Sequence, residues 1–320
     1  MIKDLCFEII ERCPNNCMFC SSLSTPNAKR KISYVDFERT ILYLQNKFGI
    51  EEVSLSGGEP LLHEDILKMV SLCTSLGIKT VLFTSGVTLQ NKNGIICTDK
   101  RYNSTEYSAI NRDILRKLRS SGLSKIVFDF QAYEEDDYNK LMGTQRHMIH
   151  MLNSILYSYF EGLQIEVHFI PNKLNYKSLP DILECLDVVE AKQLSLLNFV
   201  PQGRGRINSE QLMLSKEEME EFIKIYESVK DKYKTEIRVG IPLSSQDNHK
   251  CTAGMGKFDI KFDGTVLPCP AFKEIDIDEL KQYGVKKINI YENLDELEIY
   301  TGTRTKPLCR RIYNMTQTGL

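Results

Sequence analysis

Three cysteines lie close together near the N-terminus, in the segment ERCPNNCMFC. Cys13, Cys17 and Cys20 are separated by three and then by two residues. A structural zinc site takes four ligands, whereas three thiolates on one loop can hold three irons of a cubane cluster and leave the fourth iron open. The spacing predicts an iron–sulfur site that binds a small molecule. A zinc knuckle and three unrelated thiols are the alternatives.

A second motif, LSGGEP, follows a short apolar segment that we expect to be a strand. Gly57 and Gly58 allow a backbone to approach a ligand closely, and Glu59 adds a carboxylate acceptor before Pro60. Turns of this composition are common, so the motif alone is weak evidence. Its place one strand after the cysteines predicts that both loops lie at one edge of a sheet.

The composition is that of an ordinary soluble protein. The chain has 320 residues, 42% of them apolar and 26% charged, with a net charge of −2. We therefore expect neither nucleic acid nor an anionic membrane as a partner. The N-terminal stretch MIKDLCFEII is too short and too charged for a signal peptide, and no apolar run reaches membrane-spanning length. We expect a cytoplasmic protein, in which the ten cysteines are reduced.

Strand-like and helix-like segments alternate over the first two thirds of the chain. The expected strands are residues 5–10, 52–55, 79–83, 125–130, 163–170 and 193–199. The expected helices are the segment between Ser33 and Gly49 and residues 64–76, 111–120, 147–160 and 179–187. Six such units in order predict an α/β fold with a parallel, barrel-like sheet and a site at the carboxyl ends of its strands.

The last third of the chain differs in pattern. Ser215 and Glu218 form a capping box that opens a charged helix to about residue 233. Beyond it, apolar and polar residues alternate around Asp263-Gly264, a hairpin signal. We expect a core at 1–207, a bridging helix at 208–237 and a small C-terminal module at 238–320.

The cysteine spacing, with an aromatic residue before the third cysteine, resembles the signature of the radical S-adenosylmethionine (radical SAM) superfamily. The resemblance implies a partial (β/α)6 TIM-like barrel in which Cys13, Cys17 and Cys20 ligate a [4Fe–4S] cluster. S-adenosylmethionine chelates the open iron, and one electron cleaves it to a 5′-deoxyadenosyl radical that abstracts hydrogen from substrate. Gly57, Gly58, Glu59 and Pro60 match the superfamily's methionine-binding motif.

The resemblance also suggests further cofactor contacts. Thr84 and Ser85 end the third strand and are candidates for ribose binding, whereas Phe19 and Val200 are candidates for packing on adenine. Arg204, in the string VPQGRGR, is a candidate for binding a carboxylate of cofactor or substrate; a solvated loop arginine is the alternative. The string FDFQ, with Asp129 and Gln131, departs from the family pattern. His168 and Asn175 are further polar candidates, and His168 is more simply a strand residue.

Three cysteines near the C-terminus form a second group. Cys251, Gly264 and Cys269 follow the spacing Cys-x12-Gly-x4-Cys, which resembles the opening of the SPASM and twitch modules. By this resemblance the α+β module holds an auxiliary iron–sulfur cluster on Cys251, Cys269 and Cys309, with the fourth ligand unassigned. A structural zinc site and free thiols are the alternatives. The remaining four cysteines are expected to be structural: Cys6, Cys73, Cys97 and Cys185.

We therefore expect a radical enzyme that modifies a peptide or protein. A small molecule or cofactor precursor is the alternative substrate, and a non-catalytic iron–sulfur electron carrier is the alternative of another class. A flavodoxin or ferredoxin is the expected electron donor. The cluster begins so near the N-terminus that we expect no fused peptide-recognition domain before it. Residues 87–110 are polar and long for a loop, which predicts a lid over the barrel mouth.

Overall fold

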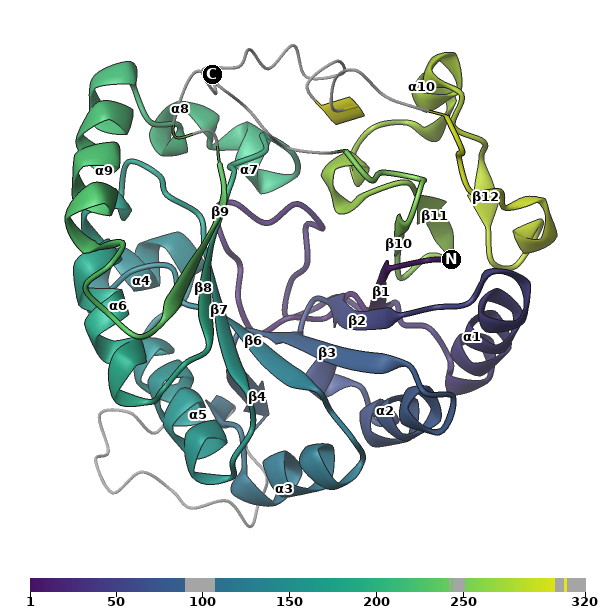
Figure 1. Cartoon of the computed structure of the whole chain (residues 1–320), viewed down its shortest axis with the longest axis horizontal. Coiled ribbons are helices and arrows are strands. Elements are labelled where there is room, and N and C mark those ends of the chain that lie inside the picture. The colour runs from purple at the N-terminus through teal and green to yellow at the C-terminus, as the bar shows by residue number, and fades with distance from the viewer. Residues whose placement is uncertain (90–106, 242, 244–250, 303–307, 310–320) are drawn as a thin grey trace.

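The computed structural model describes residues 1–89, 107–241, 243, 251–302 and 308–309. Six parallel strands follow one another around a curved sheet, and at least one helix joins each strand to the next (Figure 1). These strands are β1 (Asp4–Ile10), β2 (Glu52–Gly57), β3 (Lys79–Thr84), β6 (Lys125–Asp129), β7 (Ile165–Phe169) and β8 (Gln193–Leu197). The expected α/β fold with a parallel sheet core is confirmed.

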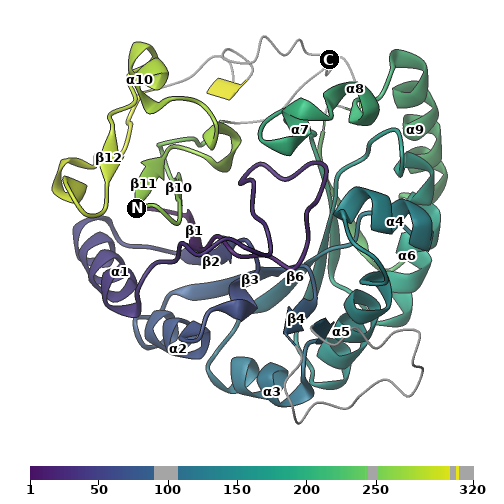
Figure 2. The same cartoon turned by 180° about the vertical axis from the view of Figure 1, so that it is seen from behind.

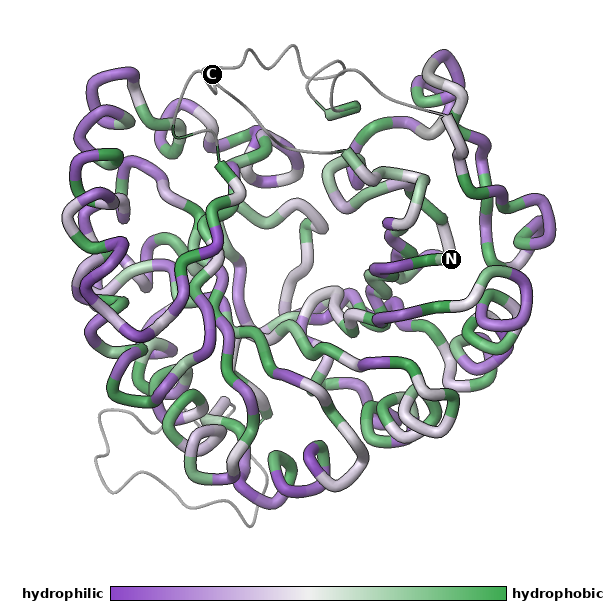
Figure 3. The backbone as a smooth tube through the Cα atoms, in the orientation of Figure 1, coloured by the Kyte–Doolittle hydropathy of each residue, from purple (hydrophilic) through white to green (hydrophobic). Residues whose placement is uncertain are grey.

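Helices cover the outer face of this sheet (Figure 1). The helices on this face are α1 (Tyr34–Phe48), α2 (Ile66–Ser75), α3 (Arg112–Ser120), α5 (Met148–Phe160), α6 (Leu179–Val188) and α9 (Lys216–Val229). The other described α-helices are α4 (Glu135–Met142), α7 (Arg204–Ile207), α8 (Ser209–Leu212) and α10 (Ile277–Leu280). Apolar and polar segments alternate around the outer helices in Figure 3, as expected for helices with one face on the core.

The predicted helix ends have the expected chemistry. The Ser33 side chain accepts a hydrogen bond from the Asp36 backbone N–H at 3.1 Å, and α1 ends at Gly49 with a φ of 72°. Ser215 and Glu218 form the predicted capping box at the start of α9. Caps satisfy backbone groups that have no partner within the helix. These local signals therefore fixed where α1 and α9 begin.

The sheet extends beyond the six expected strands on both sides. Strand β9 (Glu236–Gly240) pairs in parallel with β8, and β10 (Lys257–Ile260) pairs in parallel with β1. Beyond β10, β11 (Thr265–Leu267) and β12 (Ile288–Asn289) add antiparallel strands. The Asp263-Gly264 turn joins β10 to β11 as predicted, and Gly264 has a φ of 85°. One sheet thus crosses the boundary predicted at residue 238, and the division into domains stays a prediction.

The predicted lid lies mostly outside the described residues, because residues 90–106 and Cys97 are among those left out. Its two ends form a short antiparallel hairpin of β4 (Val87–Leu89) and β5 (Tyr107–Ala109). This hairpin packs against α5. The described part of residues 87–110 is therefore anchored to the barrel, and the lid role stays a prediction.

Two hydrophobic clusters stabilise the described chain. The larger cluster runs through the barrel strands and their helices, with Phe7 and Phe37 in ring contact at 5.0 Å between centroids. The smaller one comprises Ala253, Leu267, Phe272, Leu280 and Leu308. Among the described residues, no helix is long and apolar enough to cross a membrane.

Candidate active site

The three N-terminal cysteines lie on the loop between β1 and α1, at the carboxyl edge of the sheet. Figure 2 shows this loop, in purple, crossing the middle of the curved sheet. Cys13 is buried, whereas Cys17 and Cys20 are half-buried. We call residues 11–26 the cysteine loop. Its central place matches the position expected for the site of a parallel barrel.

One side of the cysteine loop is held by the end of α4. The backbone N–H groups of Asn16 and Met18 donate to the carbonyls of Met142 and Leu141, at 3.0 and 2.8 Å. Gly143 ends α4 with a φ of 60°, and a Cβ at this position would lie 2.3 Å from the Asn16 carbonyl oxygen. Only glycine therefore allows this close approach without a shift of the backbone.

The other side of the loop is held by Arg204. Its guanidinium Nε donates to the Cys17 carbonyl at 2.7 Å, and one Nη donates to the Ser24 carbonyl at 2.8 Å. Its backbone N–H donates to the Cys20 carbonyl at 3.0 Å. Gly203 approaches the same Cys20 oxygen so closely that a Cβ would lie 2.2 Å from it. In this structure Arg204 therefore binds the cysteine loop, and neither predicted carboxylate contact is tested.

The thiols are neighbours, but they are not arranged as ligands. Burial raises the pKa of Cys17 well above its usual value, and the nearby Cys13 and Cys20 thiols raise it further. The Cys17 sulfur lies 3.8 Å from the Met142 sulfur. Among the described residues, no three His, Cys, Asp or Glu side chains form a ready metal site.

The glycines of the second motif bring two loops together. The Gly58 and Glu59 N–H groups donate to the carbonyls of Ile10 and Arg12, at 2.6 and 2.8 Å. Added Cβ atoms at Gly57 and Gly58 would lie 2.2 and 2.1 Å from those oxygens. The motif therefore rests directly on the start of the cysteine loop, as its place in the sequence predicted.

Glu59 is fully buried beside Pro60, and its carboxylate accepts four hydrogen bonds. The Thr84 hydroxyl donates to Oε1 at 2.8 Å, and the Ser85 N–H and hydroxyl donate to Oε2 at 2.8 and 2.7 Å. The Leu61 N–H also reaches Oε1, at 3.2 Å. Burial raises the pKa of Glu59 to about 7, and the hydroxyl and N–H donors partly oppose this rise. In this structure Thr84 and Ser85 thus orient Glu59; their predicted ribose contact stays untested.

The polar candidates on the middle strands form a second network. The Gln131 amide donates to the His168 carbonyl at 3.0 Å, and the Asn175 amide donates to the Gln131 carbonyl at 2.7 Å. Burial raises the pKa of Asp129 to about 6 and lowers that of His168 to about 3. The His168 ring lies 5.0 Å from the Phe83 ring, so His168 is a neutral packed residue in this state.

The remaining candidates are less enclosed. Phe19 and Val200 are both half-buried, and the Phe19 carbonyl lies next to Gly205 of α7. Of the cysteines expected to be structural, Cys6 and Cys73 are buried and Cys185 is half-buried.

The C-terminal cysteines are brought together by the fold. Cys251, Cys269 and Cys309 all pack against the smaller hydrophobic cluster. Burial raises the pKa of Cys269 to about 11; the nearby Cys309 raises it further, whereas Lys257 lowers it. The Leu308 N–H lies 3.5 Å from the Cys251 sulfur. Like the first group, these thiols do not form a ready metal site in the described part of the chain.

A buried ion pair that the sequence did not reveal joins the C-terminal part of the chain to β1 and the cysteine loop. The Lys273 ammonium lies 2.6 Å from the Glu8 carboxylate of β1 and 3.2 Å from the Ser22 hydroxyl of the cysteine loop. Asp259 is fully buried nearby, and burial raises its pKa to about 6. The alternation of side chains along β1 puts Glu8 on the same face as Cys6. The sequence did not predict that β10 pairs with β1, and this pairing brings Asp259 and the chain that carries Lys273 close to Glu8.

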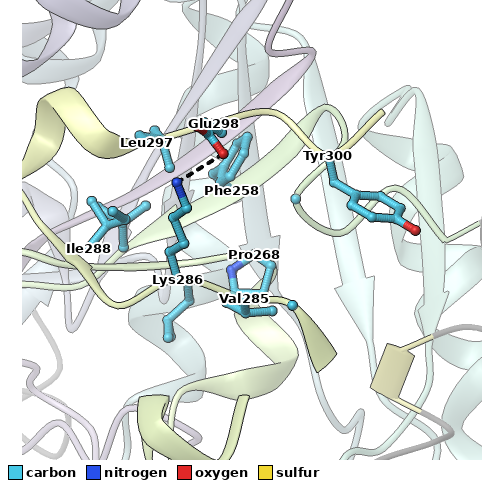
Figure 4. Close-up of a pocket in the computed structure, with 12 residues that line it drawn as sticks. Phe258, Pro268, Val285, Lys286, Ile288, Leu297, Glu298 and Tyr300 are labelled. Carbon is cyan, nitrogen blue, oxygen red and sulfur yellow. Dashed lines mark ion pairs between the residues drawn. The ribbon is translucent and has the colours of Figure 1, made fainter. Parts of the chain in front are cut away.

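A small cavity of about 80 Å³ lies farther along the C-terminal part, between Phe258, Ile288 and Leu297 (Figure 4). The ion pair of Lys286 and Glu298, 3.0 Å long, stands beside it. The cavity contains none of the residues predicted to bind the cofactor or a metal. We therefore place the candidate site at the cysteine loop and not in this cavity.

Two sequence comparisons bear on this site. Residues 7–155 match the model of the Radical SAM superfamily. The chain is 25% identical over 305 residues to a PqqA peptide cyclase of Rhodopseudomonas palustris. The aligned segment covers 92% of this chain and 75% of that protein. A PqqA peptide cyclase of Bradyrhizobium diazoefficiens is 26% identical, over 84% of this chain and 66% of that protein. The chain thus spans only part of the length of these relatives.

Solved structures share the fold. Streptococcus suis SuiB bound to S-adenosylmethionine superposes with a TM-score of 0.66 and 19% identity, over 98% of this chain and 68% of that one. Native anSMEcpe with bound AdoMet gives a TM-score of 0.63 and 14% identity, over 92% and 81%. The radical SAM family implies a [4Fe–4S] cluster and S-adenosylmethionine. The chain therefore carries a radical SAM domain over residues 7–155 and is an S-adenosylmethionine-dependent enzyme.

Proposed function

We propose that Cys13, Cys17 and Cys20 hold a [4Fe–4S] cluster whose open iron takes S-adenosylmethionine. Three thiols on one loop are a suitable donor set, and thiolates are the usual ligands of such clusters. The backbone of that loop is held by α4 on one side and by Arg204 on the other. When bound, the cluster and cofactor supply an electron and, by reductive cleavage, the species that abstracts hydrogen from substrate.

Glu59 binds the amino group of the cofactor in this proposal. Its buried carboxylate has a pKa near 7, so an adjacent ammonium group would favour the ionised form. Gly57 and Gly58 keep that loop against the cysteine loop, and Thr84 and Ser85 fix the carboxylate. We keep Phe19 and Val200 as proposed contacts of the adenine. Arg204 positions the cysteine loop.

We propose a peptide or protein as the substrate. The curated relatives are named PqqA peptide cyclase, and SuiB bound to precursor peptide SuiA shares the fold with a TM-score of 0.65, over 91% of this chain and 63% of that one. A flavodoxin or ferredoxin serves as electron donor, and the reaction takes place in the cytoplasm. A mass change in a peptide encoded beside this gene, dependent on S-adenosylmethionine, would test the substrate class.

We also propose an auxiliary iron–sulfur cluster on Cys251, Cys269 and Cys309. Their common place against the smaller hydrophobic cluster supports this assignment. The fourth ligand would be substrate, a non-cysteine side chain or solvent.

The clamped cysteine loop beside buried Glu59 is the observation on which the proposed function depends. Anaerobically reconstituted protein should be brown and should form 5′-deoxyadenosine from S-adenosylmethionine with dithionite. Cys13→Ala, Cys17→Ala and Cys20→Ala should each abolish this product. Cys185→Ala, at a half-buried cysteine of α6, is the matched control and should retain it. Product formation by the three loop variants, or a colourless zinc protein, would contradict the proposal.

A further inference from the structure

Asn15 lies between the first two cysteines and is buried. Its side-chain Oδ1 is 2.8 Å from Nδ1 of His147, the residue before α5. Its Nδ2 is buried and has no hydrogen-bond partner among the described residues. The Asn15 backbone N–H also lies at the Cys13 sulfur, where it lowers the pKa of that thiol against the larger effect of burial. Asn15 is thus part of the wall around the thiols.

His147 has the properties needed to orient this amide. It is buried, and its ring packs edge-on against Tyr107 of β5, with 5.4 Å between centroids. Burial, and then the neighbouring His150, lower the pKa of His147 to about 4. The imidazole is therefore neutral at pH 7, with one N–H. If Nδ1 carries that hydrogen, it donates to Asn15 Oδ1 and leaves the amide N–H2 as the free donor.

A buried donor without an acceptor costs about 1–3 kcal/mol, so such donors in native proteins need an explanation. Thiolates and sulfides of an iron–sulfur cluster accept hydrogen bonds, and these bonds help to set its reduction potential. We infer that Asn15 Nδ2 donates a hydrogen bond to the cluster on the cysteine loop and that His147 is the positioning residue for this bond. The inference rests on the proposed function, because it requires that cluster.

The proposed hydrogen bond should shift the reduction potential of the cluster in one definite direction. Reduction adds one electron from the external donor and makes the cluster more negative. A hydrogen-bond donor stabilises the more negative state, so Asn15 raises the reduction potential. Removing either the donor or its positioning residue should lower it. Because both residues act through one bond, the two changes should not add.

The experiment measures the potential of the cluster whose EPR signal changes when S-adenosylmethionine is added. Asn15→Leu removes the donor, and His147→Phe removes the positioning bond while keeping a ring for Tyr107. We expect a lower potential in each variant and no further shift when the two are combined. His150→Phe is the matched control, since His150 is a buried histidine three residues after His147 and makes no described hydrogen bond to Asn15; it should keep the wild-type potential.

Each outcome is decisive. Wild-type potentials in both variants, with the cluster intact, would overturn the inference and leave the proposed function standing. Absence of iron from the wild-type cysteine loop would overturn both. If Asn15→Leu fails to assemble a cluster, His147→Phe decides: a lowered potential supports the inference, and an unchanged one overturns it.

Discussion

The two cysteine groups are built in different ways. Cys13, Cys17 and Cys20 lie on one short loop, and backbone hydrogen bonds to α4 and α7 fix that loop on both sides. Its immediate surroundings are also fixed, because Glu59 is held by four hydrogen bonds. Hydrogen bonds within the protein thus position the backbone of the cysteine loop.

The second group comes from three distant segments. Cys251 precedes β10, Cys269 follows β11, and Cys309 lies some forty residues later, beside Leu308. Their shared contact is the smaller hydrophobic cluster. A site assembled from separate segments gains order when a metal joins them. The comparison predicts that the order of the site depends little on bound metal at the first group and strongly at the second.

The largest effect should be on iron content when the cysteines of one group are replaced. If both hold cubane clusters, the wild type should carry about eight irons. The triple alanine variant of Cys251, Cys269 and Cys309 should keep about four and still form 5′-deoxyadenosine.

The reciprocal variant is the control. The triple alanine variant of Cys13, Cys17 and Cys20 should keep about four irons but form no product. If that variant binds no iron while remaining folded, the auxiliary cluster does not exist.

The next largest effect concerns the buried ion pair between Lys273 and Glu8. Lys273→Met should lower the free energy of unfolding by about 3–5 kcal/mol, because it leaves the buried Glu8 carboxylate without its partner. Urea unfolding of the metal-free protein measures the loss. Lys286→Met breaks an exposed pair with Glu298 and should cost at most about 1 kcal/mol. Equal small losses in both variants would show that Lys273 does not hold the C-terminal strands to β1.

The free energy of unfolding should depend on pH through Glu59, which lies beside the first cysteine group. Burial raises the pKa of Glu59 from 4.5 to about 7, so the folded state holds this proton more tightly than the unfolded state. The stabilisation is complete below pH 4.5 and is lost as the pH rises through 7, a total of about 3 kcal/mol. The free energy of unfolding of the metal-free protein should therefore fall between pH 5 and pH 7.5. Glu59→Gln should have a flatter profile; parallel profiles would contradict this assignment.

Much of the fold was predictable because its signals are local. Apolar runs gave the six parallel strands, and cap residues gave the ends of α1 and α9. Strand β9 was missed because its residues are mostly exposed and its charged pattern resembles a loop. Helix α4 was missed because its first turn is entirely acidic and its core contacts come from Tyr138, Leu141 and Met142.

Binding of a cluster and a cofactor at the candidate site stays a prediction. The positions of its cysteine loop and its GGEP motif were predictable from the sequence, because spacing within one loop carries that information. The partners of these loops were not. Arg204 was a candidate for binding a carboxylate, with a solvated loop arginine as the alternative. The structure shows its guanidinium bonded to two loop carbonyls, and the carboxylate contact stays a prediction. His147 and Lys273 reach the cysteine loop from more than 120 residues away, and only the packing of α5 and the pairing of β10 bring them there. Contacts of this range leave no periodic signal in a single sequence.

The smallest effect should come from Arg204→Lys. Lysine keeps the charge but lacks the planar fork that lets Arg204 bind the Cys17 and Ser24 carbonyls together. Loss of one such bond should lower the free energy of unfolding by about 2 kcal/mol. It should also slow cluster reconstitution, because the loop backbone is no longer fixed. Arg206→Lys, two residues along α7 and exposed, is the matched control and should change neither quantity. Wild-type reconstitution in Arg204→Lys would show that the α4 contacts alone order the loop, and the first group would then depend on metal for its order much as the second does.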